Sequence, residues 1–133
     1  MSWLGGGAAI LVFASFYLCG DRAAGRSILN VWWLPGSARV LHCESPFTTD
    51  MLVSCYIEID PADFTGLLSG RAFVSGSTQG WIHEYPRRAA LGEDFEIADS
   101  FAYDLRDETE FGGLVLVVAD RQRHRAVVHL YIE

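Results

Sequence analysis

The most distinct pattern along the chain is a run of apolar residues near its N-terminus. Residues 3–19, WLGGGAAILVFASFYLC, contain no charged side chain, and charge returns at Asp21. As a helix rising about 1.5 Å per residue, this run spans roughly 26 Å, close to the ~30 Å hydrocarbon core of a bilayer. Trp3 and Tyr17 stand near its ends, where aromatic rings favour the membrane–water interface. We therefore predict that residues 1–26 form a hydrophobic N-terminal anchor or uncleaved signal with a short juxtamembrane segment.

Three other interpretations of this run stay open. A cleaved signal peptide needs a basic start and small residues before the cleavage site, and neither is clear. A lipoprotein would use Cys19, although the bulky Phe16-Tyr17-Leu18 precedes it. A buried helix is the third, and Gly5-Gly6-Gly7 weakens any helix by about 1 kcal/mol per glycine relative to alanine. A membrane anchor with an extracytoplasmic domain is the expectation, although Arg22 and Arg26 after the run favour a cytoplasmic C-terminus.

Residues 27–133 carry the patterns of a single small domain. Residues 39–44 look extended, and residues 51–59 alternate between apolar and other side chains, which is typical of a half-buried strand. The segment Asp60-Pro61-Ala62-Asp63-Phe64 is typical of a helix start, with Asp60 as the cap and Pro61 at the first helical position. We therefore expect a hairpin followed by one short helix.

The end of the chain has the clearest strand patterns. Residues 114–119 and 126–132 are rich in β-branched side chains and are joined by a polar turn, and residues 101–105 suggest a neighbouring strand. The predicted fold class is α+β. An N-terminal hydrophobic helix precedes an antiparallel sheet in the order ββ-α-βββ, with one short helix packed on the sheet.

Two short motifs resemble a known kind of protein. The segment Leu34-Pro35-Gly36-Ser37-Ala38-Arg39-Val40, Asp50, and the helix start at residues 60–64 resemble small, uncharacterised bacterial membrane-anchored or envelope proteins. Those proteins carry an LPxSAxxV motif, a strand, a PxDF helix start and a closing hairpin. The resemblance implies an envelope-associated domain and brings no catalytic residues with it.

Composition excludes several classes of function. The 133 residues carry a formal charge of −7, and all ten basic residues are arginines. An acidic chain of this kind is unsuited to general nucleic-acid binding. Without lysine, Schiff-base and P-loop chemistry are excluded. We expect no cofactor.

Cysteines and histidines are the first candidates for chemistry. Cys43 and Cys55 face each other across the predicted hairpin, at a distance that fits a disulfide outside the cytoplasm or two small buried side chains inside it. None of the four histidines forms a metal motif. A zinc site would require His42 and His129 to converge from separate strands, so we predict no metal and no catalytic residue.

Charged residues are concentrated in two places. Arg121, Arg123 and Arg125 lie in the last hairpin turn, where they either protect the sheet edge or contact anionic headgroups, as Arg87 and Arg88 also could. A longer acidic stretch is a possible binding surface for a partner or a plain solvated face. It comprises Glu93, Asp94, Glu96, Asp99, Asp104, Asp107, Glu108 and Glu110.

These observations lead to three functional hypotheses. The first is a non-enzymatic module, anchored in the membrane through residues 3–19, that contacts a protein partner at the bacterial cell envelope. The second is an acidic immunity-type protein that neutralises a basic toxin or effector. The third is a small metal-dependent hydrolase built around His42 and His129.

Overall fold

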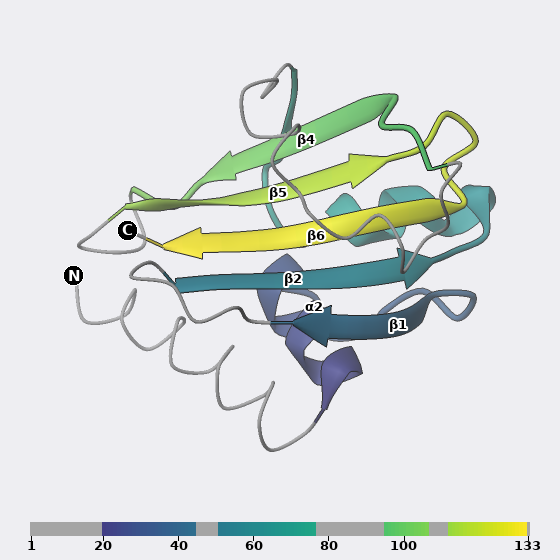
Figure 1. The fold of residues 1–133 in the computed structure, drawn as a ribbon, viewed down its shortest axis with the longest axis horizontal. Coiled ribbons are helices and arrows are strands. Elements are labelled where there is room, and N and C mark those ends of the chain that lie inside the picture. The colour runs from purple at the N-terminus through teal and green to yellow at the C-terminus, as the bar shows by residue number, and fades with distance from the viewer. Residues whose placement is uncertain (1–19, 45–50, 77–94, 107–111, 133) are drawn as a thin grey trace.

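The structure is a computed structural model of the chain, and it describes residues 20–44, 51–76, 95–106 and 112–132. In chain order, the described elements begin with a helix and end with a strand (Figure 1). They are α2 (Asp21–Leu29), β1 (Arg39–Glu44), β2 (Met51–Glu58), the 3-10 helix η2 (Pro61–Leu68), β3 (Val74–Ser75), β4 (Asp99–Asp104), β5 (Gly113–Ala119) and β6 (Arg125–Ile132).

The strands form one six-stranded antiparallel sheet in the order β1-β2-β6-β5-β4-β3. Strands β1 and β2 pair as one hairpin, and β5 and β6 pair as another. The last strand, β6, lies between β2 and β5, so it joins the two hairpins. Register along β2 and β6 is regular from Met51↔Ile132 to Glu58↔Arg125. The end of the chain therefore forms the centre of the sheet.

Helix α2 has the charges and the cap that a short helix needs. Asp21 lies in its first turn and Arg26 in its last, which matches the helix dipole, and Asn30 ends the helix in the left-handed conformation with φ 58°. Its apolar side is fully buried at Ala24 and Ile28, one helical turn apart. Packing against the sheet thus stabilises a helix that would be marginal alone.

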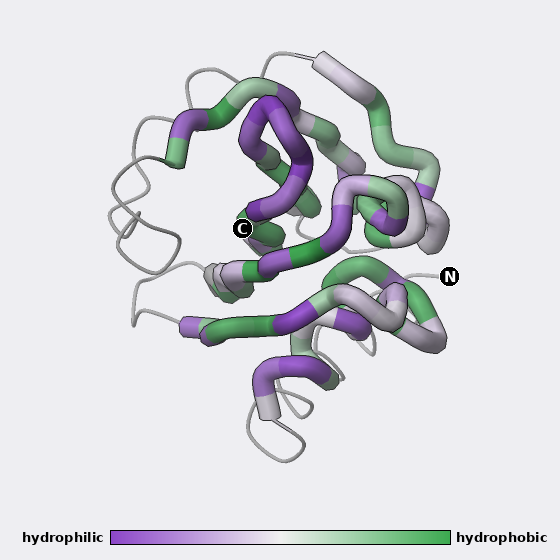
Figure 2. Tube along the Cα trace, turned by 90° about the vertical axis from the view of Figure 1, so that its right-hand side faces the viewer, coloured by the Kyte–Doolittle hydropathy of each residue, from purple (hydrophilic) through white to green (hydrophobic). Residues whose placement is uncertain are grey.

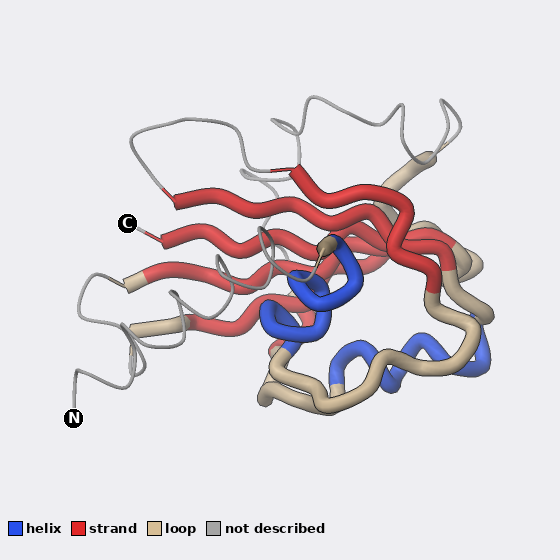
Figure 3. Tube along the Cα trace, turned by 90° about the horizontal axis from the view of Figure 1, so that it is seen from below, coloured by secondary structure: helices blue, strands red, loops and turns tan. Residues whose placement is uncertain are grey.

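Both helices cover the same face of the sheet, as the view from below shows (Figure 3). The apolar core between them includes Ile28, Phe64 and the inward residues of β2, such as Val53 and Ile57, all with no exposed surface. Helix η2 begins where Asp60 accepts a hydrogen bond from the Ala62 amide at 3.0 Å. The cap and the proline that the sequence predicts at this helix start are confirmed.

The opposite face of the sheet has its own buried cluster. Tyr56, Phe95, Leu116, Val118 and Val127 belong to it. Strand β5 is therefore buried on both faces, which is why its sequence is continuously apolar rather than alternating. Hydrophilic residues gather mainly in the turns and at strand ends (Figure 2).

The predicted fold class is wrong in its arrangement of elements. The only α-helix among the described residues is α2, which precedes the first strand, and the helix after β2 is a 3-10 helix. The sheet also gains β3, two residues long, at its edge. The sequence prediction missed α2 because nine residues containing Gly25 and Ser27 have weak helix propensity. The predicted domain boundary between residues 26 and 27 falls inside this helix.

The predicted hydrophobic helix over residues 3–19 lies outside the described residues. Among the helices that the structure describes, none has the length and apolar character needed to cross a bilayer.

Candidate functional site

A buried hydroxyl–imidazole pair lies on the sheet face opposite the helices. Ser54 of β2 and His129 of β6 are partners in the strand register, and Ser54 Oγ lies 2.7 Å from His129 Nδ1. The side chains are nearly inaccessible, with exposed fractions of 4% and 2%. Burial lowers the pKa of His129 to about 3, so the imidazole is neutral near pH 7. This pair was not predicted, because 75 residues separate its members.

A serine bonded to a histidine is also a component of nucleophilic catalysis. That chemistry needs a serine that a substrate can reach and a histidine that can take up its proton. Ser54 is buried, and His129 has a pKa far below its ordinary value because protonation inside the core is costly. The pair is therefore suited to fixing the register of β2 against β6.

Next to this pair, Tyr56 of β2 donates its hydroxyl hydrogen to Glu44 Oε1 of β1 at 2.7 Å. The tyrosine ring is buried within the second cluster while its hydroxyl reaches the sheet edge. Alternation along β2 places Ser54 and Tyr56 on one face, which the sequence already indicated. Their partners could not be identified without the strand order.

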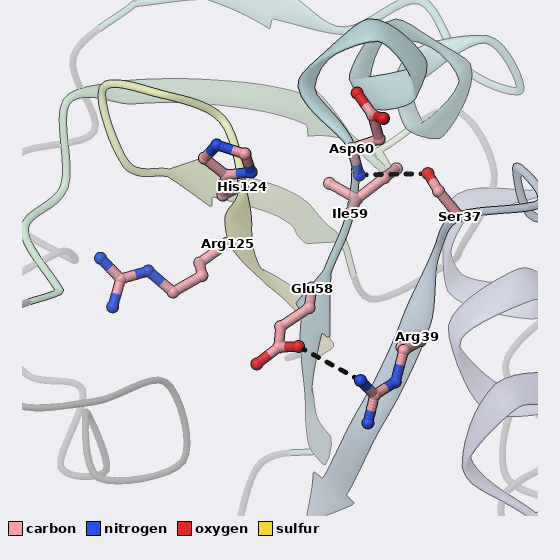
Figure 4. A pocket seen from close by; sticks show the side chains of 7 residues that line it. All are labelled: Ser37, Arg39, Glu58, Ile59, Asp60, His124 and Arg125. Atoms are coloured by element: carbon pink, nitrogen blue, oxygen red, sulfur yellow. Dashed lines mark hydrogen bonds and ion pairs between the residues drawn. The ribbon is translucent and has the colours of Figure 1, made fainter.

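An open pocket of about 490 Å³ lies where β1 begins and β2 ends (Figure 4). Its lining consists of Ser37, Arg39, Glu58, Ile59, Asp60, His124 and Arg125. Arg39 Nη1 lies 3.7 Å from Glu58 Oε2, and the Asp60 amide donates to Ser37 Oγ at 3.1 Å. The hydroxyl of Ser37 in turn donates to Asp63 Oδ2 at 2.7 Å.

The two arginines of this pocket are matched by carboxylates within the protein. Arg125 Nε lies 3.2 Å from Asp120 Oδ2, so each arginine of the pocket has a carboxylate beside it. An anion site would instead leave arginines facing the cavity without such neighbours. The pocket therefore has a mixed polar lining rather than the character of a phosphate site.

His42 and His129 do not converge on a metal site. Strand β2 lies between β1, which carries His42, and β6, which carries His129. His42 Nδ1 is 3.8 Å from Asp21 Oδ2, whereas His129 bonds Ser54. The described part of the chain contains no group of three His, Cys, Asp or Glu side chains placed to hold a metal. His83 lies outside the described residues.

The predicted acidic surface is described only in part. Glu96 is exposed. Asp99 Oδ2 lies 3.1 Å from Arg123 Nε, and Asp104 Oδ2 lies 3.0 Å from Arg106 Nε. These ion pairs compensate two of the three described carboxylates. The other acidic residues of the stretch lie outside the described residues, namely Glu93, Asp94, Asp107, Glu108 and Glu110.

The arginines of the last hairpin turn differ in their surroundings. The guanidinium carbon of Arg123 lies 5.1 Å from the ring centre of Phe64 and 5.7 Å from that of Phe101. Arg125 lies over Phe95 at 5.7 Å. Arg121 is exposed. Arg123 and Arg125 thus hold the turn against the core. Neither predicted role, protection of the sheet edge or contact with anionic headgroups, included this packing. Arg87 and Arg88 lie outside the described residues.

Cys43 and Cys55 lie directly opposite each other in the β1–β2 register, as the spacing predicts. A disulfide joins their sulfur atoms, and both side chains are buried in the core beneath the helices. The first residue of α2 also contacts this edge, because the Cys43 amide donates to Asp21 Oδ2 at 3.1 Å.

Two exposed tryptophans follow helix α2. Trp32 and Trp33 have exposed fractions of 86% and 82%. Arg26 Nη1 donates to the Trp32 carbonyl at 3.1 Å, and the next residue, Leu34, is buried. The chain around the indoles is therefore held while the indoles project outward. The sequence pattern alone does not predict this exposure.

Comparison with protein-family models, with curated proteins and with solved structures found no match. The resemblance to small envelope proteins therefore stays a prediction.

Proposed function

We propose that this protein is a membrane-attached, non-enzymatic interaction module at the bacterial cell envelope. The observation that carries the proposal is the position of α2 in the chain. Only Gly20 separates the apolar residues 3–19 from this helix, and Ala24, Ile28 and Leu29 of the helix have no exposed surface. A membrane segment there would hold the sheet close to the bilayer without a flexible linker.

The surroundings of the described polar groups support the non-enzymatic part of the proposal. Ser54 and His129 are buried against each other. The two arginines of the open pocket lie next to carboxylates. Such an arrangement favours contact with a protein partner over a reaction in that pocket.

Membrane extraction of the full chain from cells tests the attachment. We expect the chain to stay with the membrane in high salt and in alkaline carbonate and to be released by detergent. The L11R/F13R variant places two charges inside the apolar run and should appear in the soluble fraction, because each charge at a bilayer centre costs about 2.5–3.5 kcal/mol. The L11I/F13L variant is the matched apolar control. A wild-type chain that carbonate extracts would overturn the proposal.

The disulfide supports an extracytoplasmic domain, because disulfides persist mainly in oxidising compartments. Cys43 and Cys55 are buried, so thiols must be trapped by acid and alkylated after unfolding. With three cysteines in the chain, we expect only Cys19 to react before reduction and all three to react after it. Free thiols at Cys43 and Cys55 in cells would instead place the domain in the cytoplasm.

A further inference from the structure

The exposed indoles of Trp32 and Trp33 form a small apolar projection next to α2. A tryptophan carries a large apolar surface and one N–H donor, which suits it to surroundings that are apolar on one side and wet on the other. Two adjacent indoles at more than 80% exposure therefore indicate a surface that is covered when the protein is at work. The buried Leu34 and the bond from Arg26 hold their backbone in place.

Positive charge lies on the helix that precedes this projection, although the whole chain carries −7. Arg22 and Arg26 lie one turn apart on α2 and so share a side of the helix. Asp21 is the only acidic residue between positions 20 and 40. The structure shows Arg22 donating to the Ala38 carbonyl and Arg26 to the Trp32 carbonyl. A guanidinium has five N–H donors, so each arginine has further donors that suit a phosphate.

The length of α2 limits how the chain can meet a membrane. Nine residues give a helix of about 13.5 Å, whereas the polar interfacial layer on each side of a bilayer is only roughly 5–8 Å thick. If residue 19 leaves the bilayer at this layer, a helix standing upright would lift Trp32 out of it. Residue 19 and Trp32 both reach the interface when α2 lies along the membrane plane. The sheet then lies on the side of the helices that faces away from the membrane (Figure 3).

We propose that Trp32 and Trp33 insert into the interfacial layer of an anionic phospholipid bilayer while Arg22 and Arg26 contact lipid phosphates. The domain then has a second membrane contact beside residues 3–19, and this contact sets its orientation. The inference rests on the proposed function, because it assumes a chain already at the membrane. The neighbouring arginines favour a lipid surface over an apolar protein groove.

The full chain in phosphatidylcholine vesicles containing phosphatidylglycerol tests the insertion. In the W3F/W81F background Trp32 and Trp33 are the only tryptophans, so excitation selective for tryptophan reports on them alone. We expect brominated lipids to quench this emission and aqueous acrylamide to quench it weakly. A reporter carrying R121W as its only tryptophan, on the exposed β5–β6 turn, should show the reverse pattern. Circular dichroism confirms that each variant is folded.

The arginines supply the second readout. One basic residue near an anionic surface contributes about 1 kcal/mol, so R22Q should lower the ratio of inserted to exposed indole by about fivefold. The R121Q variant loses the same charge on the exposed turn and should leave this ratio unchanged. Equal effects of the two variants would overturn the role of Arg22.

The possible failures are distinguishable. A chain that floats with the vesicles but has acrylamide-accessible indoles overturns the insertion and leaves the proposed function standing. A chain that does not float overturns both. Indoles protected from acrylamide but not quenched by brominated lipid would show that they contact protein, and this also overturns the insertion.

Discussion

The two faces of the sheet differ in what they bury. Beneath α2 and η2 the core is apolar, and it contains the disulfide between Cys43 and Cys55. The opposite face buries Ser54 and His129 among apolar side chains. An apolar face is insensitive to pH, whereas a buried neutral histidine resists protonation and makes folding depend on pH. The faces should therefore respond to different conditions, one to reductant and the other to acid.

Acid should have the largest effect, and it acts on the face that carries His129. The pKa of this histidine is about 3 when folded, against 6.5 for an ordinary histidine. Below the higher value the unfolded chain binds a proton that the folded chain does not. The contribution of neutral His129 to the free energy of unfolding should therefore be fully present above pH 6.5. It should fall by about 1.4 kcal/mol per pH unit as the pH drops below that value toward 3.

Urea unfolding of the full chain in mild detergent, followed by circular dichroism at several pH values, measures this slope. The S54A/H129L variant removes both partners of the hydrogen bond, so it leaves no polar group stranded. Its slope should lack the contribution of His129. An unchanged slope in this variant would show that His129 does not control the acid response.

Reductant should have the next largest effect, and it acts on the helix-covered face. The disulfide closes a short loop between residues 12 positions apart, and a loop of this size contributes about 2–3 kcal/mol by restricting the unfolded chain. Dithiothreitol should lower the free energy of unfolding by this amount and leave the acid slope unchanged. The C43A/C55A variant should be less stable and insensitive to dithiothreitol. Sensitivity in that variant would mean that reductant acts elsewhere.

The sequence predicted this contrast only in part. Strands β1, β2, β5 and β6 were placed within about one residue, because alternation and β-branched runs are local signals. The facing cysteines also followed from a local feature, the hairpin. The pairing of Ser54 with His129 requires β6 to lie beside β2, and no local pattern encodes that strand order.

The exposure of Trp32 and Trp33 was harder to predict than the composition of the core. Hydrophobicity alone favours burial of the indoles in Val31-Trp32-Trp33-Leu34, whereas both are exposed in the structure. Their exposure follows from α2, whose cap at Asn30 turns the chain and whose neighbour Leu34 takes the buried position. The sequence pattern predicted no element over this stretch, so the projection could not be anticipated.

The smallest effect on the free energy of unfolding should come from substitutions in the β5–β6 turn, whose arginines contact both faces of the sheet. Arg123 stacks on Phe64 and Phe101 and pairs with Asp99, whereas Arg121 is exposed two residues earlier. R123Q should lower the free energy of unfolding by about 1 kcal/mol, and R121Q should change it by less than about 0.5 kcal/mol. D99N removes the ion pair but keeps the stacking, so R123Q should cost more than D99N. Equal losses in these two variants would assign the whole effect to the ion pair, and the aromatic contacts would then contribute nothing measurable to joining the turn to the helix-covered core.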